Sequence, residues 1–304
     1  MARRRKGRPI SGVLLLDKPY GVSSNRALQK ARGLFQAQKA GHTGTLDPMA
    51  TGLLPVLFGE ATKFSSLLLD ADKRYQASLR LGQTTATGDA EGDILSERPV
   101  PELESSRLEH VLAQFTGDIE QIPPMYSALK HEGRPLYELA REGREIKRAP
   151  RAVSVYHIGL LETRESGFSI DVTCSKGTYI RTLAMDIGEA LGCGAHLNAL
   201  RRFKTGPFDA ESMVTLEVLE HLSDDERQAH LLPIDALLTH LPSVEVDDES
   251  VARFRQGQAL AYNETYPSQT LIRVYDRTRT LLGVALLNEG QLAPKRVINT
   301  VEDI

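Results

Sequence analysis

A single aspartate, Asp47, stands where glycine and threonine residues lead into an apolar run. The surrounding segment, residues 41–64, reads GHTGTLDPMATGLLPVLFGEATKF. No second carboxylate, cysteine or evident metal ligand lies beside the aspartate in the chain. An aspartate can act alone as a nucleophile or as a proton acceptor. The segment therefore raises the question of which reaction needs one carboxylate and nothing else nearby.

A purely structural interpretation of the same residues is available. Asp47 is a suitable helix N-cap, and Pro48 suits the first position of a helix. Met49, Leu53 and Leu54 would then belong to the core. This interpretation explains the Asp-Pro pair but not the whole segment.

A phosphotransferase interpretation fails on the residue order. Enzymes of the haloacid dehalogenase type also contain Thr-Gly-Thr, with the nucleophilic aspartate in the order Asp-Lys-Thr-Gly-Thr. Here Gly41 and His42 occupy those two positions, so that chemistry has no nucleophile.

Composition indicates an ordinary globular protein. The chain has 304 residues, which favours two domains, and 41% of them are hydrophobic and 25% charged. No apolar run approaches the roughly 18–20 residues of a membrane span, and the basic start MARRRKGRPISG lacks the apolar region of a secretory signal. Cys174 and Cys193 show no zinc spacing. We expect a cytoplasmic protein without a structural metal.

The net charge of −3 hides a strong asymmetry. Residues 211–249 carry eleven acids and one base, which leaves +7 for the rest of the chain. The N-terminal ARRRKGR carries five positive charges, residues 128–151 carry seven bases against four acids, and HLNALRRFK adds three bases. Such clusters suit a surface that binds phosphates, although a solvated face or a disordered tail would look the same.

The pattern of apolar residues predicts interspersed helices and strands. Strict alternation predicts strands over RYQASLRLG and FSIDVTCSKG, and an apolar run predicts a buried strand over SGVLLLDKPYG. Helical spacing predicts helices over SSNRALQKARGLF, over ESSRLEHVLAQFTG up to Gly117, and over TYIRTLAMDIGEALG. There is no strict βαβ rhythm and no GxGxxG or P-loop. We therefore predict an α+β fold with a mixed, mainly antiparallel sheet.

The acid-rich segment predicts a domain boundary. Beyond it, SVEVDDESVARFRQGQAL predicts a small strand and a capped helix, and TLIRVYD and TLLGVALL predict two strands. We expect a basic tail over residues 1–10, a catalytic domain over 11–240 with a basic insert at about 125–151, and a small barrel-like domain over 241–304.

The segment around Asp47 resembles the catalytic motif of the TruB family of tRNA pseudouridine synthases. The resemblance runs in order from about residue 11 to 298, and Ser23-Ser24 replaces the family's more usual Thr-Ser. The other matching segments are LLLDKPYGVSSN, KRYQASLRLGQTTATGDAEGD, QIPPMYSALKHEGRPLYELAREG, CSKGTYIRTLAMDIG, AHLNALRRFKTGPF and LLGVALLNEGQLAPKRVI. The last of these resembles the small RNA-binding, PUA-like domain of bacterial members.

The resemblance implies the isomerisation of uridine to pseudouridine at position 55 in the T loop of tRNA, without cofactor or metal. Asp47 would be the essential residue, acting by attack on the sugar, attack on the base or removal of a sugar proton. Burial raises the pKa of a carboxylate, so a nearby cation must keep it charged, and Arg181 is the arginine that the family motif supplies.

The same resemblance implies a pocket for a base that has left its stack. Tyr75 would stack on the base, and Leu200 would press on it from the other side. His42 would help to hold the opened T loop, Tyr179 would form a pocket wall, and Lys18 would support the catalytic loop. Apart from the family match, these residues would be taken for core or turn residues.

The implied partner is tRNA, held at its T arm by the basic insert and at its acceptor end by the PUA-like domain. We expect a monomer without an obligatory protein partner. Two alternatives stay open. One is a pseudouridine synthase that depends on a guide RNA and protein partners, and the other is a non-catalytic protein of the same fold that binds or folds tRNA.

Overall fold

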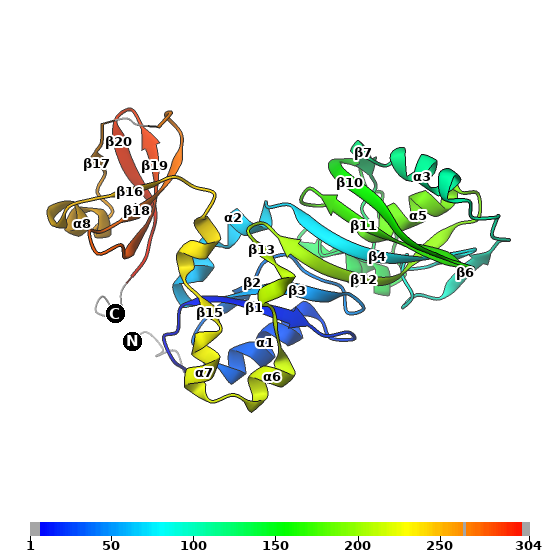
Figure 1. Cartoon of the computed structure of the whole chain (residues 1–304), viewed down its shortest axis with the longest axis horizontal. Coiled ribbons are helices and arrows are strands. Elements are labelled where there is room, and N and C mark those ends of the chain that lie inside the picture. The colour runs from blue at the N-terminus through cyan, green and yellow to red at the C-terminus, as the bar shows by residue number, and fades with distance from the viewer. Residues whose placement is uncertain (1–6, 264–265, 300–304) are drawn as a thin grey trace.

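Two β-sheets organise the chain (Figure 1). The computed structural model describes residues 7–263 and 266–299. Residues 1–6 of the predicted basic tail and residues 300–304 of the predicted C-terminal domain lie outside the described residues.

The larger sheet has eleven strands and is mixed but mainly antiparallel, as predicted. Its main path runs β14-β1-β3-β12-β4-β11-β10-β7, with β2, β13 and β15 paired at its side. Only the pairs β1–β14 and β3–β12 are parallel among the described strands of this sheet. The strands are β1 (Gly12–Lys18), β2 (Ala40–His42), β3 (Thr51–Phe58), β4 (Lys73–Leu81), β7 (Gly117–Gln121), β10 (Arg151–Arg164), β11 (Gly167–Cys174), β12 (Ala195–Thr205), β13 (Phe208–Asp209), β14 (Val214–Thr215) and β15 (Leu231–Leu232).

The alternating pattern of β4 gives the strand one buried face. Tyr75, Ala77, Leu79 and Leu81 are buried, whereas Gln76 and the other even-numbered positions are more exposed. Successive side chains of a strand point to opposite faces. The predicted strand and its two faces are thus confirmed.

The longer helices that pack on the large sheet lie on one of its faces, and a short helix with two 3-10 turns (residues 59–69 and 234–238) packs on the opposite face of β1 and β3. Helices α3 and α5 pack on the part formed by β4, β10, β11 and β12, and α1 and α6 pack on β1 and β3. The helices are α1 (Ser24–Leu34), α2 (Ser65–Leu69), α3 (Ser105–Ala113), α4 (Leu136–Arg141), α5 (Ile180–Ala190), α6 (Leu216–His221), α7 (Asp224–Ala229) and α8 (Asp248–Arg255), with short 3-10 turns η1 (Gly59–Phe64), η2 (Ala210–Ser212) and η3 (Ile234–Leu238). Helix α3 ends at Ala113, before the predicted stop, and Gly117 begins β7.

The helix start considered at Asp47 is wrong. Residues 47–50 form a turn between β2 and β3, in which the Ala50 N–H donates to the Asp47 carbonyl at 3.1 Å. Pro48 occupies the second position of this turn, which its fixed φ suits. The apolar residues that follow form a β-strand because β3 pairs along its length with β1. Met49 and Leu53 are buried, as expected.

The second sheet is small and curls over its own core. Its order is β16-β18-β19-β20-β17, and helix α8 packs against it through the fully buried Phe254. The strands are β16 (Ser243–Glu245), β17 (Leu260–Ala261), β18 (Leu271–Tyr275), β19 (Leu281–Asn288) and β20 (Gln291–Val297). Two separate hairpins complete the strands: β5 (Gln83–Thr85) with β6 (Ile94–Glu97), and β8 (Lys130–His131) with β9 (Arg134–Pro135).

The small sheet contacts the first through the segment that joins them. Val284 of β19 packs with Leu237 and Leu238 of η3. The Tyr275 hydroxyl donates to Asp235 at 3.1 Å, which ties β18 to the same turn. Within residues 7–263 and 266–299, none of the helices combines the length and apolar character of a membrane crossing.

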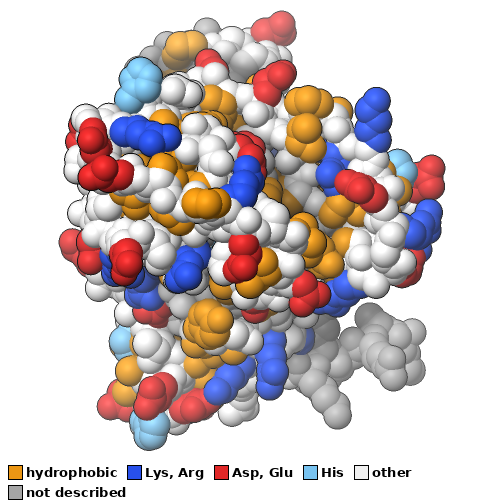
Figure 2. All heavy atoms as spheres, turned by 90° about the vertical axis from the view of Figure 1, so that its right-hand side faces the viewer, with side chains coloured by type: hydrophobic (Ala, Val, Ile, Leu, Met, Phe, Trp, Pro, Cys, Tyr) orange, Lys and Arg blue, Asp and Glu red, His pale blue; other side chains and the backbone are white. Residues whose placement is uncertain are grey.

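Ion pairs and burial reduce the positive charge that the basic segments present to solvent. In the insert, Arg134 and Arg144 lie in ion pairs with Glu142, and Arg148 lies in one with Glu145. In HLNALRRFK, Arg201 pairs with Asp17, and Arg202 is 1% exposed. Acidic and basic side chains are interspersed on the face that Figure 2 shows. The free positive charge is therefore smaller than the sequence suggested.

The packing of α5 on β12 requires a glycine. A Cβ on Gly188 would clash with the backbone nitrogen and the Cβ of Ala195. We expect Gly188→Ala to lower the free energy of unfolding by about 1–3 kcal/mol, because backbone has to move. Denaturant unfolding measures this change.

Gly33 provides the matched control. It lies in α1 and is exposed, and a Cβ added there would meet no atom within 4 Å. Gly33→Ala should raise the free energy of unfolding by up to about 1 kcal/mol, through helix propensity alone. Equal effects of the two substitutions would contradict the close contact at Gly188.

Candidate active site

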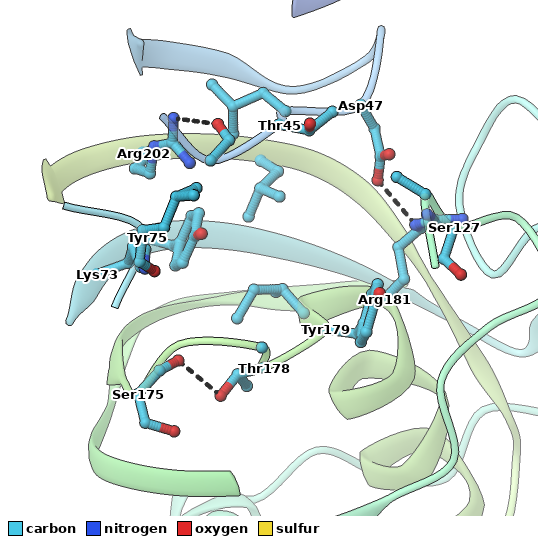
Figure 3. A pocket seen from close by; sticks show the side chains of 17 residues that line it. Thr45, Asp47, Lys73, Tyr75, Ser127, Ser175, Thr178, Tyr179, Arg181 and Arg202 are labelled. Atoms are coloured by element: carbon cyan, nitrogen blue, oxygen red, sulfur yellow. Dashed lines mark hydrogen bonds and ion pairs between the residues drawn. The ribbon is translucent and has the colours of Figure 1, made fainter. Parts of the chain in front are cut away.

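A cavity of about 290 Å³ lies where the 43–50 loop, strands β4 and β12 and the start of α5 meet (Figure 3). Five of the seven predicted site residues line it: Asp47, Tyr75, Tyr179, Arg181 and Leu200. The other two, Lys18 and His42, are not among the lining residues. The remaining lining residues are Gly44, Thr45, Leu46, Leu69, Lys73, Ser127, Ala128, Ser175, Gly177, Thr178, Ile180 and Arg202.

Asp47 and Arg181 form an ion pair at one side of the cavity. The Arg181 Nε lies 2.9 Å from the Asp47 Oδ2. The Arg181 side chain is 5% exposed, whereas the Asp47 side chain is 38% exposed. The arginine is thus a fixed part of the wall, and the carboxylate it holds is open to a molecule in the cavity.

The remaining N–H groups of Arg181 bind two further loops. Its Nη1 donates to the Thr87 carbonyl at 2.9 Å, and its Nη2 donates to the Tyr126 carbonyl at 2.6 Å. The buried Asp89 also lies 3.5 Å from Nη1. A guanidinium has five donors in one plane, which allows one side chain to join three segments.

The pKa of Asp47 reflects opposing influences. Loss of hydration raises it above its ordinary value, and the nearby Asp89 raises it as well. The charge of Arg181 and its hydrogen bond lower it again, as does the charge of Lys18. A carboxylate in this position relies on its cations to remain ionised.

Lys18 binds the backbone of the 43–50 loop next to Asp47. Its side chain is fully buried, and its Nζ donates to the carbonyls of Pro19 at 2.9 Å, Val22 at 2.5 Å and Pro48 at 3.1 Å. Burial lowers the pKa of Lys18 to about 8. The contact with Pro48 joins the end of β1 to the residue next to Asp47.

Tyr75 and Leu200 come from neighbouring strands. Tyr75 on β4 and Leu200 on β12 are each 9% exposed and line the same cavity. Burial raises the pKa of the Tyr75 hydroxyl. The cavity wall thus contains an aromatic ring and an apolar side chain, the two kinds of surface that a planar group packs against.

Tyr179 is the N-cap of α5, and the side chain of Gln121 fixes its backbone. Gln121 Oε1 accepts from the Tyr179 N–H at 2.9 Å, and Gln121 Nε2 donates to the Tyr179 carbonyl at 3.2 Å. Burial raises the pKa of the Tyr179 hydroxyl. Gln121, at the end of β7, thus positions the helix turn that carries Arg181.

His42 ends β2, directly before the loop. Its Nδ1 is buried without a hydrogen-bond partner among the described residues. Burial lowers the pKa of His42, and the charge of Arg202 lowers it further. The imidazole is therefore disposed to stay neutral.

Sequence reasoning missed four polar residues of this region. Lys73 and Arg202 line the cavity, Asp89 contacts Arg181, and Gln121 binds Tyr179. Two of them could have been found from the sequence. Lys73 lies two residues from Tyr75 on β4, and Arg202 lies two residues from Leu200 on β12, so each shares a strand face with a predicted site residue. Among the described residues, no three His, Cys, Asp or Glu side chains gather to hold a metal ion.

The two hydrogen bonds between the Gln121 side chain and the Tyr179 backbone should contribute to the stability of the fold. Gln121→Met removes both partners of the Tyr179 backbone, so we expect the free energy of unfolding to fall by about 1–3 kcal/mol. Gln29→Met serves as the control, because Gln29 is exposed on α1 and should change stability by about 0.5 kcal/mol or less. Denaturant unfolding of both variants checks the difference. An unaltered free energy of unfolding in Gln121→Met would contradict the role of the Gln121 side chain in positioning α5.

Comparison with known proteins gives matches over nearly the whole chain. The model of the family described as "TruB family pseudouridylate synthase (N terminal domain)" matches residues 32–180. The "tRNA pseudouridylate synthase B C-terminal domain" matches residues 181–239, and "Pseudouridine synthase II TruB, C-terminal" matches residues 242–298.

Curated relatives and solved structures agree with these matches. A tRNA pseudouridine synthase B of Chromohalobacter salexigens is 58% identical over 99% of this chain and 98% of its own, and one of Cupriavidus metallidurans is 54% identical over 96% and 95%. The structure described as "Crystal Structure of a Cbf5-Nop10-Gar1 Complex" has a TM-score of 0.72 and 28% identity, covering 95% of this chain and 84% of that chain. The one described as "Structure of H/ACA RNP bound to a substrate RNA containing 2'-deoxyuridine" has a TM-score of 0.72 and 26% identity, covering 99% and 92%.

These matches cover both sheets and every segment that lines the cavity. The fold is that of the pseudouridine synthases, and the chain belongs to the TruB family of pseudouridylate synthases.

Proposed function

We propose that this protein isomerises uridine to pseudouridine in tRNA, at position 55 of the T loop. The observation that carries the proposal is the Asp47–Arg181 ion pair, which presents one carboxylate to a cavity lined by Tyr75 and Leu200. The relatives support the substrate class, because proteins named tRNA pseudouridine synthase B match this chain over almost their entire length.

The reaction asks little of the protein beyond one ionised carboxylate. The N1–C1′ bond of the nucleotide breaks, the uracil turns, a C5–C1′ bond forms, and the C5 hydrogen leaves as a proton. The substrate supplies both the leaving group and the new bonding atom, so no external nucleophile is consumed. Asp47 is the group we assign to the ribose or base during the bond exchange, and Arg181 keeps it charged and oriented.

The target base has to leave the T-loop stack to reach Asp47. Enzymes that act on bases commonly extrude them and bind them between aromatic and apolar side chains. Tyr75 and Leu200 both line the cavity and supply an aromatic and an apolar side chain. We assign Tyr75 to stacking and Leu200 to packing on the opposite side.

The remaining assignments concern the hold on the RNA. We assign His42 to the opened T loop, Tyr179 to the pocket wall and Lys18 to support of the catalytic loop. The basic insert, residues 125–151, would close over the T arm, and the domain of residues 241–304 would touch the acceptor end. We propose that the protein acts in the cytoplasm as a monomer, without a cofactor or an obligatory protein partner.

A guide-dependent synthase is not favoured as an alternative. The Cbf5-Nop10-Gar1 and H/ACA RNP structures above are 26–28% identical to this chain, whereas the tRNA pseudouridine synthases are 54–58% identical over nearly all of it. A non-catalytic binding protein would have no use for a buried arginine that holds a carboxylate open to the cavity.

Tritium release from tRNA labelled at uridine C5 tests the proposal. The wild type should release about one equivalent from the T loop of an unmodified transcript, because one C5 hydrogen leaves per turnover. Asp47→Asn keeps the size of the side chain but removes the charge, so release should be abolished while tRNA binding persists.

Asp171→Asn is the matched control. Asp171 is also an aspartate bonded to an arginine, Arg74 at 2.9 Å, but it is buried and does not line the cavity. It should release tritium at a rate close to that of the wild type. Tight tRNA binding without release by the wild type would overturn the proposal in favour of a binding protein, and full activity of Asp47→Asn would overturn the role of the carboxylate.

A further inference from the structure

Arg202 is a fully buried cation without a carboxylate partner. Its side chain lies in β12 and is 1% exposed, which makes it one of the largest buried side chains of the described chain. Within residues 7–263 and 266–299, no carboxylate lies within ion-pair distance of its guanidinium. Its neighbour Arg201 differs, since it forms two hydrogen bonds with Asp17 at 3.0 and 2.6 Å. Burying an unpaired charge is costly, so the position of Arg202 calls for a functional reason.

The guanidinium binds both arms of the loop that carries Asp47. Its Nη2 donates to the Gly44 carbonyl at 3.0 Å, and its Nε donates to the Leu53 carbonyl at 2.7 Å. These carbonyls lie three residues before and six residues after the aspartate. The loop is therefore held at both arms by one rigid, planar group.

Two glycines of the loop make room for this arrangement. Gly44 has a φ of +75°, and a Cβ there would lie 3.2 Å from the Arg202 Nη1. Gly52 has a φ of +94°, and a Cβ there would clash with the backbone of Arg202, its partner in the β3–β12 pairing. Both glycines of the segment 43–53 thus adopt positive φ and face the same arginine.

Arg202 also lies directly across the strand pair from Tyr75. The register of β4 and β12 pairs these two residues, so their side chains are close neighbours. Figure 3 shows Arg202, Tyr75 and Lys73 on one side of the pocket and Asp47 with Arg181 on the other. Burial raises the pKa of Tyr75, and the charge of Arg202 acts against that rise.

We propose that Arg202 is a positioning residue for the reaction, which sets the place of Asp47 through the Gly44 and Leu53 carbonyls and holds Tyr75 from the adjacent strand. This inference rests on the proposed function. Arg181 orients the carboxylate itself, whereas Arg202 places the backbone from which the carboxylate projects.

The test compares Arg202→Lys with Arg201→Lys. Lysine keeps the charge but has a single donor point in place of the planar fork, so it cannot hold both carbonyls in the same way. We expect Arg202→Lys to lower the single-turnover rate of tritium release about 10- to 100-fold, the effect of a small displacement of a reacting group. The Kd for the tRNA transcript should stay within about twofold of the wild type, and Arg201→Lys should match the wild type in rate.

A second measurement reports on the loop without any turnover. Amide hydrogen exchange of the segment 43–53 should speed up in free Arg202→Lys and stay unaltered in free Arg201→Lys. Arg202→Ala leaves a space with the shape of the missing guanidinium group. Guanidinium ion added at millimolar concentration should restore part of the single-turnover rate of tritium release in this variant. Such rescue distinguishes a lost positioning group from a damaged fold.

The outcomes separate the inference from the function on which it rests. If the wild type releases no tritium, the proposed function fails, and the exchange measurement still decides whether Arg202 holds the loop. If the wild type is active but Arg202→Lys has the wild-type rate, or loses only tRNA affinity, or shows wild-type exchange over 43–53, the positioning role is overturned.

Discussion

The pairing of a buried guanidinium with a carboxylate that faces the cavity is the constraint on which the rest of the site depends. Asp47 is surrounded closely enough for its pKa to rise, and Asp89 adds repulsion. Arg181 opposes both effects at a distance of 2.9 Å. Because Arg181 is itself buried, it has to be held by carbonyls from other segments, Thr87 and Tyr126, and this requirement brings three loops to the start of α5.

The 43–50 loop illustrates how the sheet supports that pair. Lys18 at the end of β1 binds the Pro48 carbonyl, and Arg202 on β12 binds the Gly44 and Leu53 carbonyls. The loop therefore rests on side chains from two strands of the sheet and reaches α5 through Arg181. A reactive group on a loop gains the rigidity of the sheet in this way.

Much of this architecture could be predicted from the chain. Local periodicity is sufficient for β4 and α5, whose buried faces depend on neighbouring residues only. The helix start at Asp47-Pro48 was wrong because local capping signals cannot register the pairing of β3 with β1. Asp47, Tyr75 and Arg181 were assigned from family motifs, and the structure brings them to one cavity. The sequence predicts Arg202 as a surface charge, because charge alone does not reveal which arginine the pairing of β3 with β12 buries.

Titration of the Asp47 carboxyl by carbon NMR, with the signal assigned by its absence in Asp47→Asn, tests whether Arg181 keeps this carboxylate charged. In the free wild type, the pKa should lie above the ordinary value of 3.8, with the group still ionised at neutral pH. In Arg181→Met the pKa should rise further, because the cation that opposes burial is gone while Asp89 remains. An unaltered pKa in Arg181→Met, or a protonated Asp47 at neutral pH in the wild type, would show that Arg181 does not hold Asp47 in its charged form.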